Sequence, residues 1–194
     1  ILVTATMPQE GVSSASLQIA KVYEAMGHRV ALLCVEADNV FMAIHNSAPR
    51  RLDGLACSEY KTKFDGLDIL EINGKQNCFA ITKSVLEVLT GMGDAYDYVV
   101  IDSPPSGNRD ESVHLMVKAA DAVVYVTRKN KSKLTYLRYA NQIAETYQLK
   151  IFGFVFLSGN DDIGIDGTTF SKMRKPQIQN LNPRGWWRSF DKMS

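Results

Sequence analysis

The chain has 194 residues, of which 45% are hydrophobic and 22% are charged, and this composition is typical of one globular domain with a sizeable core. A formal net charge of +1 gives no overall electrostatic reason to expect nucleic acid or an anionic membrane as a partner. Three cysteines without C-x-x-C spacing argue against a disulfide framework or a zinc site and indicate reduced thiols in the cytosol.

Short β-branched runs alternate with longer amphipathic segments along most of the chain. Runs of strand character, most of them almost continuously apolar, occupy 1–4, 29–35, 67–72, 96–102, 122–127 and 151–157. Segments with the length and apolar spacing of helices occupy 13–26, 78–91, 110–120 and 132–148. This alternation predicts an α/β fold, a three-layer sandwich with a mainly parallel sheet and helices on both faces. We expect one domain over 1–158 and a polar C-terminal tail over 159–194, partly docked or flexible.

The first predicted strand runs into a glycine-containing loop, "ATMPQEGVSSAS", that leads into a helix. Ligands of parallel sheets bind at the carboxyl ends of strands, so this loop is one place to search, with 36–40 and 102–110. Gly11 allows close backbone approach, and the amides of residues 10–14 would point from the helix N-terminus toward an anion. Ser13 stands where the hydroxyl of a phosphate-binding loop would coordinate Mg²⁺.

Acidic side chains follow two further strands at the same edge of the predicted sheet. The stretch "LLCVEAD" places Glu36 and Asp38 just after the end of the strand predicted over 29–35, and a carboxylate there could polarise a water or an acceptor hydroxyl. The stretch "YDYVVIDSPP" delivers Asp102, and in P-loop proteins an aspartate at this place holds the water shell of the metal. A plain glycine turn, a turn-forming aspartate and solvated strand-end acids are the alternatives, but the order of the three motifs favours one shared site.

In this order, the loop, "LLCVEAD" and "YDYVVIDSPP" resemble the cytoplasmic ATPase domain of bacterial tyrosine autokinases (BY-kinases). Members of this family control chain length in exopolysaccharide and capsule biosynthesis. They belong to the deviant-Walker class of P-loop proteins, together with partition and division-site ATPases. The resemblance covers residues 1–158 and implies a P-loop NTPase-like fold that binds Mg-ATP or Mg-ADP.

The resemblance also implies roles for individual residues. Nucleotide binding would fall to the loop and the start of the helix, at Glu10, Gly11, Val12, Ser13 and Ser14. The metal would be held by Ser13 and Asp102. The catalytic positions would be Glu36, Asp38 and Asp102.

The chain departs from the kinase pattern within this one site. The pentad that typically reads Gly-Glu-Gly-Lys-Ser/Thr is QEGVS at 9–13, so Val12 replaces the phosphate-binding lysine. Loss of a charge-assisted hydrogen bond costs about 1.5–3 kcal/mol of binding, and loss of a transition-state contact costs about 100- to 1,000-fold in rate. The second motif has Glu36 where the family has aspartate, and no tyrosine follows Tyr147, whereas the kinases end in a tyrosine cluster. We therefore expect no efficient phosphoryl transfer.

The leading hypothesis is a degenerate member of the family, a pseudokinase or weak nucleotide binder that acts through protein contacts. It would be cytoplasmic, at the inner face of the cell membrane, as a homo-oligomer that binds a polysaccharide co-polymerase or another export-machinery protein and no nucleic acid. Two alternatives stay open: an active ATP-dependent protein-tyrosine autokinase whose missing cation comes from another residue or subunit, and a partition-type ATPase. No apolar run reaches the roughly 18 residues of a membrane-spanning helix. Because the sequence begins at Ile1 without an initiator methionine, we expect a fragment, and upstream membrane segments stay open.

Overall fold

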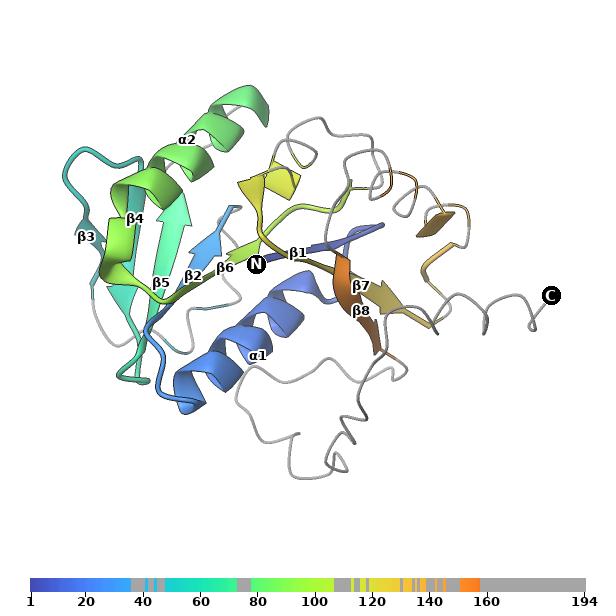
Figure 1. Cartoon of the computed structure of the whole chain (residues 1–194), viewed down its shortest axis with the longest axis horizontal. Helices are drawn as coiled ribbons and strands as arrows, with labels where there is room; N and C mark the ends of the chain where they lie inside the picture. Colours follow the sequence, from blue (N-terminus) through green and yellow to red (C-terminus); the bar gives the residue numbers. More distant parts are fainter. Residues whose placement is uncertain are drawn as a thin grey trace.

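The computed structural model describes most of the chain up to residue 157 (Figure 1). The described segments are 1–35, 48–72, 78–106, 119–129 and 151–157. Further described positions are 41, 44, 113, 116, 117, 131–133, 135, 137, 138, 142 and 145, and for 78, 79, 151 and 152 only the backbone is described. These residues include one mixed sheet and the helices that cover it.

The described strands form one sheet in the order β3-β4-β5-β2-β6-β1-β7-β8. The parallel strands are β1 (Leu2–Ala5), β2 (Val30–Cys34), β5 (Leu67–Ile72), β6 (Tyr98–Asp102), β7 (Val123–Arg128) and β8 (Ile151–Leu157). A hairpin of β3 (Arg50–Arg51) and β4 (Cys57–Lys61) pairs antiparallel along the edge of β5. Because β1 lies between β6 and β7, the loop after β1 emerges beside the carboxyl ends of both neighbours.

Alternate residues of the parallel strands face two hydrophobic cores, one on each side of the sheet. The described helices are α1 (Val12–Ala25), α2 (Cys78–Gly91) and the short 3-10 helix η2 (Gly93–Ala95). Leu2 and Leu33 pack in the core that α2 covers, whereas Val3 and Leu32 pack in the core that α1 covers. Figure 1 shows α1 and α2 on opposite faces of the sheet. Burial on both faces explains the continuous apolar runs, and the predicted three-layer α/β sandwich is confirmed.

The six predicted strands and the first two predicted helices are all present, with ends close to the predicted positions. In the predicted helices 110–120 and 132–148, described positions such as Val113 and Leu137 are helical, and the other positions lie largely outside the described residues. The tail over 159–194 also lies outside them, so the domain boundary stays a prediction. In the part of the chain that the structure describes, no helix has both the length and the apolar character to cross a bilayer.

The hairpin β3–β4 is not among the predicted strands, because it is short and polar and is held by charges. Glu59, almost fully buried, pairs with Arg50 at 2.6 Å and with Lys61 at 3.2 Å. Lys61 also pairs with Asp68 at 2.7 Å, and Tyr96 Oη donates to Asp68 at 2.9 Å and to Glu59 at 3.3 Å. Burial alone would raise the pKa of Glu59, but the hydrogen bonds from Lys61 and Arg50 hold it below its usual value. Burial and the two carboxylates raise the pKa of Tyr96.

Candidate functional site

The carboxyl ends of β1, β6 and β2 lie side by side at one edge of the sheet. Asp102, the last residue of β6, is in register with Val3 of β1 and with Cys34 of β2. The Asp102 side chain is almost fully buried, and its Oδ1 lies 3.3 Å from Ser16 Oγ of α1. The predicted metal-site aspartate thus lies beside the helix into which the glycine-containing loop leads.

The loop between β1 and α1 (residues 6–11, the β1–α1 loop) has left-handed backbone at two positions. Gly11 has φ +93° and Gln9 has φ +60°. Gln9 occupies the place of a glycine in the kinase pentad, and left-handed backbone costs a residue with a Cβ roughly 1–2 kcal/mol. A Cβ added to Gly11 would lie 2.6 Å from Leu157 Cδ1. The β1–α1 loop therefore makes a left-handed turn at Gln9 without a glycine there, and it requires the glycine at position 11.

The first amides of α1 are oriented for an anion. α1 begins at Val12 and has no side-chain cap. The opening N–H groups of a helix have no acceptor inside the helix, and the helix dipole adds partial positive charge there. Ser13 and Ser14 are half-buried in this first turn. The backbone of residues 12–14 can therefore donate hydrogen bonds to a phosphate group.

Glu10 is fully buried and holds the β1–α1 loop together from inside. Its Oε2 accepts hydrogen bonds from Thr6 N at 2.9 Å, Thr6 Oγ1 at 3.1 Å and Met7 N at 3.0 Å. Its Oε1 accepts a short hydrogen bond from Ser132 Oγ. These donors satisfy a carboxylate that would otherwise be costly to bury. The amides of Thr6 and Met7 are thus occupied within the protein, which leaves the start of α1 for a ligand.

Val12, at the place of the kinase lysine, packs into the protein. It is half-buried and contacts the hydrophobic core that α1 covers. One turn further, Ser16 is fully buried, and its Oγ lies 2.9 Å from Val12 O and 3.3 Å from Asp102 Oδ1. Asp102 is therefore linked to α1 through Ser16, a residue that no sequence pattern singled out.

A basic turn that begins at the last residue of β7 contacts the β1–α1 loop, and its residues are not among the predicted site residues. The basic turn comprises Arg128, Lys129, Lys131 and Ser132. Arg128 Nη1 donates to Gln9 O at 3.4 Å, and Lys131 Nζ lies 3.3 Å from Gln9 O and 3.1 Å from Gln9 Oε1. Ser132 Oγ accepts from Arg128 N at 2.8 Å. The signal in the sequence is "RKNKSK" directly after a predicted strand, since parallel strands end at one edge of the sheet.

The predicted catalytic residues Glu36 and Asp38 lie outside the described residues, so their place relative to the β1–α1 loop stays a prediction. Among the described residues, no group of three or more His, Cys, Asp and Glu side chains could hold a metal ion. Mg²⁺ at a phosphate site takes most of its ligands from water and phosphate and needs only one or two from protein carboxylates. A hydroxyl and a carboxylate, as at Ser13 and Asp102, are oxygen donors of the kind that Mg²⁺ binds, and the assignment of these two residues to a metal stays a prediction.

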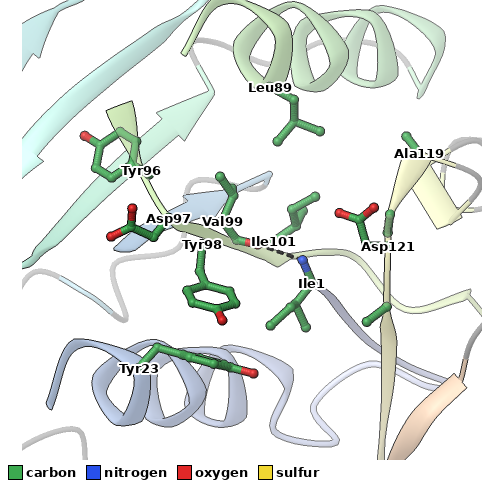
Figure 2. Close-up of a pocket in the computed structure, with 12 residues that line it drawn as sticks. Ile1, Tyr23, Leu89, Tyr96, Asp97, Tyr98, Val99, Ile101, Ala119 and Asp121 are labelled. Atoms are coloured by element: carbon green, nitrogen blue, oxygen red, sulfur yellow. Dashed lines mark hydrogen bonds between the residues drawn. The ribbon is translucent and has the colours of Figure 1, made fainter. Parts of the chain in front are cut away.

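A pocket of about 610 Å³ lies at the opposite edge of the sheet, where β1, β6 and β7 begin (Figure 2). Its lining residues are Ile1, Tyr23, Leu89, Tyr96, Asp97, Tyr98, Val99, Ile101, Ala119, Ala120, Asp121 and Ala122. The rings of Tyr23 and Tyr98 stack at its side, with centroids 4.2 Å apart. None of these residues belongs to the β1–α1 loop, so this pocket is separate from the candidate phosphate site.

The sequence matches no protein-family profile and no curated protein, whereas solved structures share its fold. The kinase domain of the Escherichia coli tyrosine kinase ETK is 15% identical, with 82% of this chain and 68% of that chain covered and a TM-score of 0.65. The VpsO kinase domain is 21% identical, with 82% and 84% covered and a TM-score of 0.68. The septum site-determining protein MinD from Pyrococcus horikoshii OT3, solved with Mg-ADP, is 17% identical, with 80% and 68% covered and a TM-score of 0.59. At these identities, the likeness shows that the chain shares the α/β fold of these domains.

Proposed function

We propose that this chain, which has the fold of the bacterial tyrosine-kinase domains, is a nucleotide-binding module of exopolysaccharide or capsule biosynthesis in which phosphoryl transfer is weak or lost. It acts as a pseudokinase, through protein contacts that depend on bound Mg-ATP or Mg-ADP. The observation that carries this proposal is the β1–α1 loop. Its backbone is left-handed at Gln9 and Gly11, while Val12, half-buried, packs against the core at the position where the kinase pattern has lysine.

Binding would use the backbone first. The uncapped start of α1 offers its amides to the phosphates of the nucleotide, and the helix dipole favours their negative charge. Ser13 would coordinate Mg²⁺, and Asp102, held by Ser16, would accept hydrogen bonds from the water shell of the metal. The bound metal would neutralise part of the phosphate charge.

Catalysis would be weak because the side chain of Val12 carries no charge. In phosphoryl transfer the protein contributes mainly positioning and electrostatic stabilisation of charge on the transferred group. Loss of one such stabilising group typically lowers the rate by about 100- to 1,000-fold. An active tyrosine autokinase and a MinD-type ATPase are the competing functions, and both require measurable ATP turnover.

Calorimetric titration with Mg-ADP tests the proposal, on the wild type and on Val12→Lys and Val12→Met. We expect weak binding by the wild type and about 10- to 100-fold tighter binding by Val12→Lys, since a charge-assisted hydrogen bond contributes about 1.5–3 kcal/mol. Val12→Met is the matched control, because it lengthens the side chain without a charge and should bind like the wild type. Absence of binding by both the wild type and Val12→Lys would contradict a phosphate site in the β1–α1 loop.

A second assay separates the pseudokinase from the competing enzymes. The wild type is incubated with Mg-ATP, and released phosphate and phosphotyrosine on the protein are measured. We expect neither above background. Sub-micromolar nucleotide binding together with ATP turnover would overturn the pseudokinase assignment, and phosphotyrosine on the isolated chain would identify the active autokinase.

The same proposal gives the chain a place and a partner. It would lie at the cytoplasmic face of the cell membrane, as a homo-oligomer bound to a polysaccharide co-polymerase or another export-machinery protein. The kinase-domain fold supports this assignment by analogy. The net charge of +1 gives no indication of nucleic acid as a partner. Co-expression with the co-polymerase, followed by sizing with and without Mg-ADP, tests it: a nucleotide-dependent complex is expected, and two separate species would contradict the proposed partner.

A further inference from the structure

We infer that the positive charge that Val12 does not supply comes from Arg128 and Lys131 of the basic turn, which bind the phosphates of a nucleoside di- or triphosphate from the β7 side. This inference rests on the proposed nucleotide site and names the cations of that site. It concerns residues that the sequence motifs leave unassigned.

Two cations converge on one backbone carbonyl of the β1–α1 loop. Arg128 Nη1 lies 3.4 Å and Lys131 Nζ lies 3.3 Å from Gln9 O, and Lys131 Nζ also reaches Gln9 Oε1 at 3.1 Å. Gln9 is only two positions before Gly11, where the anion-binding turn leads into α1. Two positive charges that converge on one place beside the loop attract an anion to it, and a phosphate group is such an anion.

The contacts of both cations with Gln9 are exposed to solvent, so a ligand can reach them. A guanidinium offers a planar fork that matches phosphate oxygens, and an ammonium offers a mobile point charge. Together they provide the type of charge that a lysine at position 12 would provide, from the end of a neighbouring strand instead of from α1.

Ser132 and Glu10 fix the basic turn against the β1–α1 loop. Ser132 Oγ accepts from Arg128 N at 2.8 Å and donates to Glu10 Oε1, while Glu10 Oε2 is bonded to the start of the loop. The turn is closed by hydrogen bonds to Arg128 O from Lys131 N at 3.1 Å and from Ser132 N at 3.0 Å. Ser132 is therefore a positioning residue, because it acts on a ligand only through the placement of Arg128 and Lys131.

Lys129 provides the matched comparison within the same turn. It is exposed, its backbone N donates to Leu157 O at 2.9 Å, and among the described residues its side chain makes no hydrogen bond to the β1–α1 loop. Substitution of Lys129 removes the same unit of charge from the same turn, so it separates general electrostatic attraction from the specific placement of Arg128 and Lys131.

The test is calorimetric titration of the full chain with Mg-ADP and, separately, with inorganic pyrophosphate. Arg128→Gln and Lys131→Gln should each weaken binding about tenfold and the double variant about 100-fold, as expected for charge-assisted hydrogen bonds. Lys129→Gln should stay within about twofold of the wild type. Ser132→Ala should weaken binding, and Ser132→Thr, which keeps the hydroxyl, should restore it. A thermal unfolding curve for each variant checks that it is folded at the titration temperature.

The outcomes distinguish the role of Arg128 and Lys131 from the existence of the nucleotide site on which that role depends. If the wild type binds and the double variant binds equally well, the inference is wrong and the nucleotide site stands. If only Val12→Lys binds, the basic turn does not replace the lysine, although the β1–α1 loop is a phosphate site. If neither the wild type nor Val12→Lys binds, the role of the basic turn and the nucleotide site are both wrong. Should the double variant unfold, Lys131→Arg and Lys131→Gln decide, because only the variant that keeps the charge should retain wild-type affinity.

Discussion

Replacement of Glu10 by alanine removes the carboxylate that connects the β1–α1 loop to the basic turn, and its cost follows from the hydrogen bonds that this carboxylate accepts. Thr6 is buried, so its N–H would be left without an acceptor and without access to water, at about 1–3 kcal/mol. Met7 N and the hydroxyls of Thr6 and Ser132 also donate to this charged acceptor and would no longer do so. Met7 is half-buried, so water can accept the hydrogen bond from its N–H and lower the cost there. For all the lost hydrogen bonds together, we expect destabilisation by about 3–5 kcal/mol.

This destabilisation should lower the melting temperature by about 6–20 °C, since 1 kcal/mol corresponds to about 2–4 °C for a chain of this size. Glu10→Gln is the matched control. It keeps the volume and one carbonyl oxygen for Thr6 and Met7, so we expect destabilisation by about 1 kcal/mol, or about 2–4 °C. Both variants are measured by circular dichroism melting at pH 7. Equal melting temperatures for Glu10→Ala and Glu10→Gln would refute the structural role of the carboxylate.

Three further predictions concern glycine geometry, the hairpin and acid. Gly11→Ala should destabilise the chain by about 1–3 kcal/mol from left-handed strain, and further through its contact with Leu157, because the added Cβ lies 2.6 Å from that side chain. Gly54→Ala is the control, because Gly54 has a similar left-handed backbone (φ +77°) but an added Cβ there would have no atom within 4 Å. The melting temperature of Gly54→Ala should fall less than that of Gly11→Ala, and an equal fall would contradict the clash with Leu157. Tyr96→Phe removes two hydrogen bonds to carboxylates and should cost about 1–2 kcal/mol, or about 2–8 °C; an unchanged melting curve would show that these bonds contribute nothing. Because the folded-state pKa of Glu59 lies below its ordinary value of 4.5, its stabilisation is present above pH 4.5 and is lost as the pH falls through the folded-state pKa. When the pH is lowered through this range, the melting temperature of the wild type should therefore fall by up to about 2–4 °C more than that of Glu59→Gln. Melting temperatures of the two proteins that fall in parallel with pH would contradict this role of Glu59.

The predictable part of the fold is the part that hydrophobic periodicity determines. Strands covered on both faces must be apolar at consecutive positions, as at Leu32 and Leu33, which pack in opposite cores. Glycine is also tolerated at helix N-caps, and Gly11, directly before an amphipathic segment, is the N-cap of α1. These local signals suffice for the parallel strands, for the two helices and for the position of the β1–α1 loop.

Other features depend on contacts that no local pattern encodes. The hairpin β3–β4 alternates polar and apolar residues only briefly, and Glu59 is buried there because Arg50 and Lys61 reach it. The left-handed conformation of Gln9 carries no signal in the sequence, because glutamine is not a residue that favours it. Arg128 lies 119 positions from Gln9, so only the strand order brings them together.

The most direct test of the central claim is a ¹⁵N–¹H correlation spectrum of the wild type titrated with Mg-ADP. If the end of the β1–α1 loop and the start of α1 form a phosphate site without a lysine, the amide resonances of Gly11, Val12, Ser13 and Ser14 should shift together. These shifts should saturate as the Mg-ADP concentration rises. If these four amides stay in place, or if the shifts fall on Tyr98 and Val99 at the opposite edge of the sheet, nucleotide does not bind at this loop and the central claim is wrong.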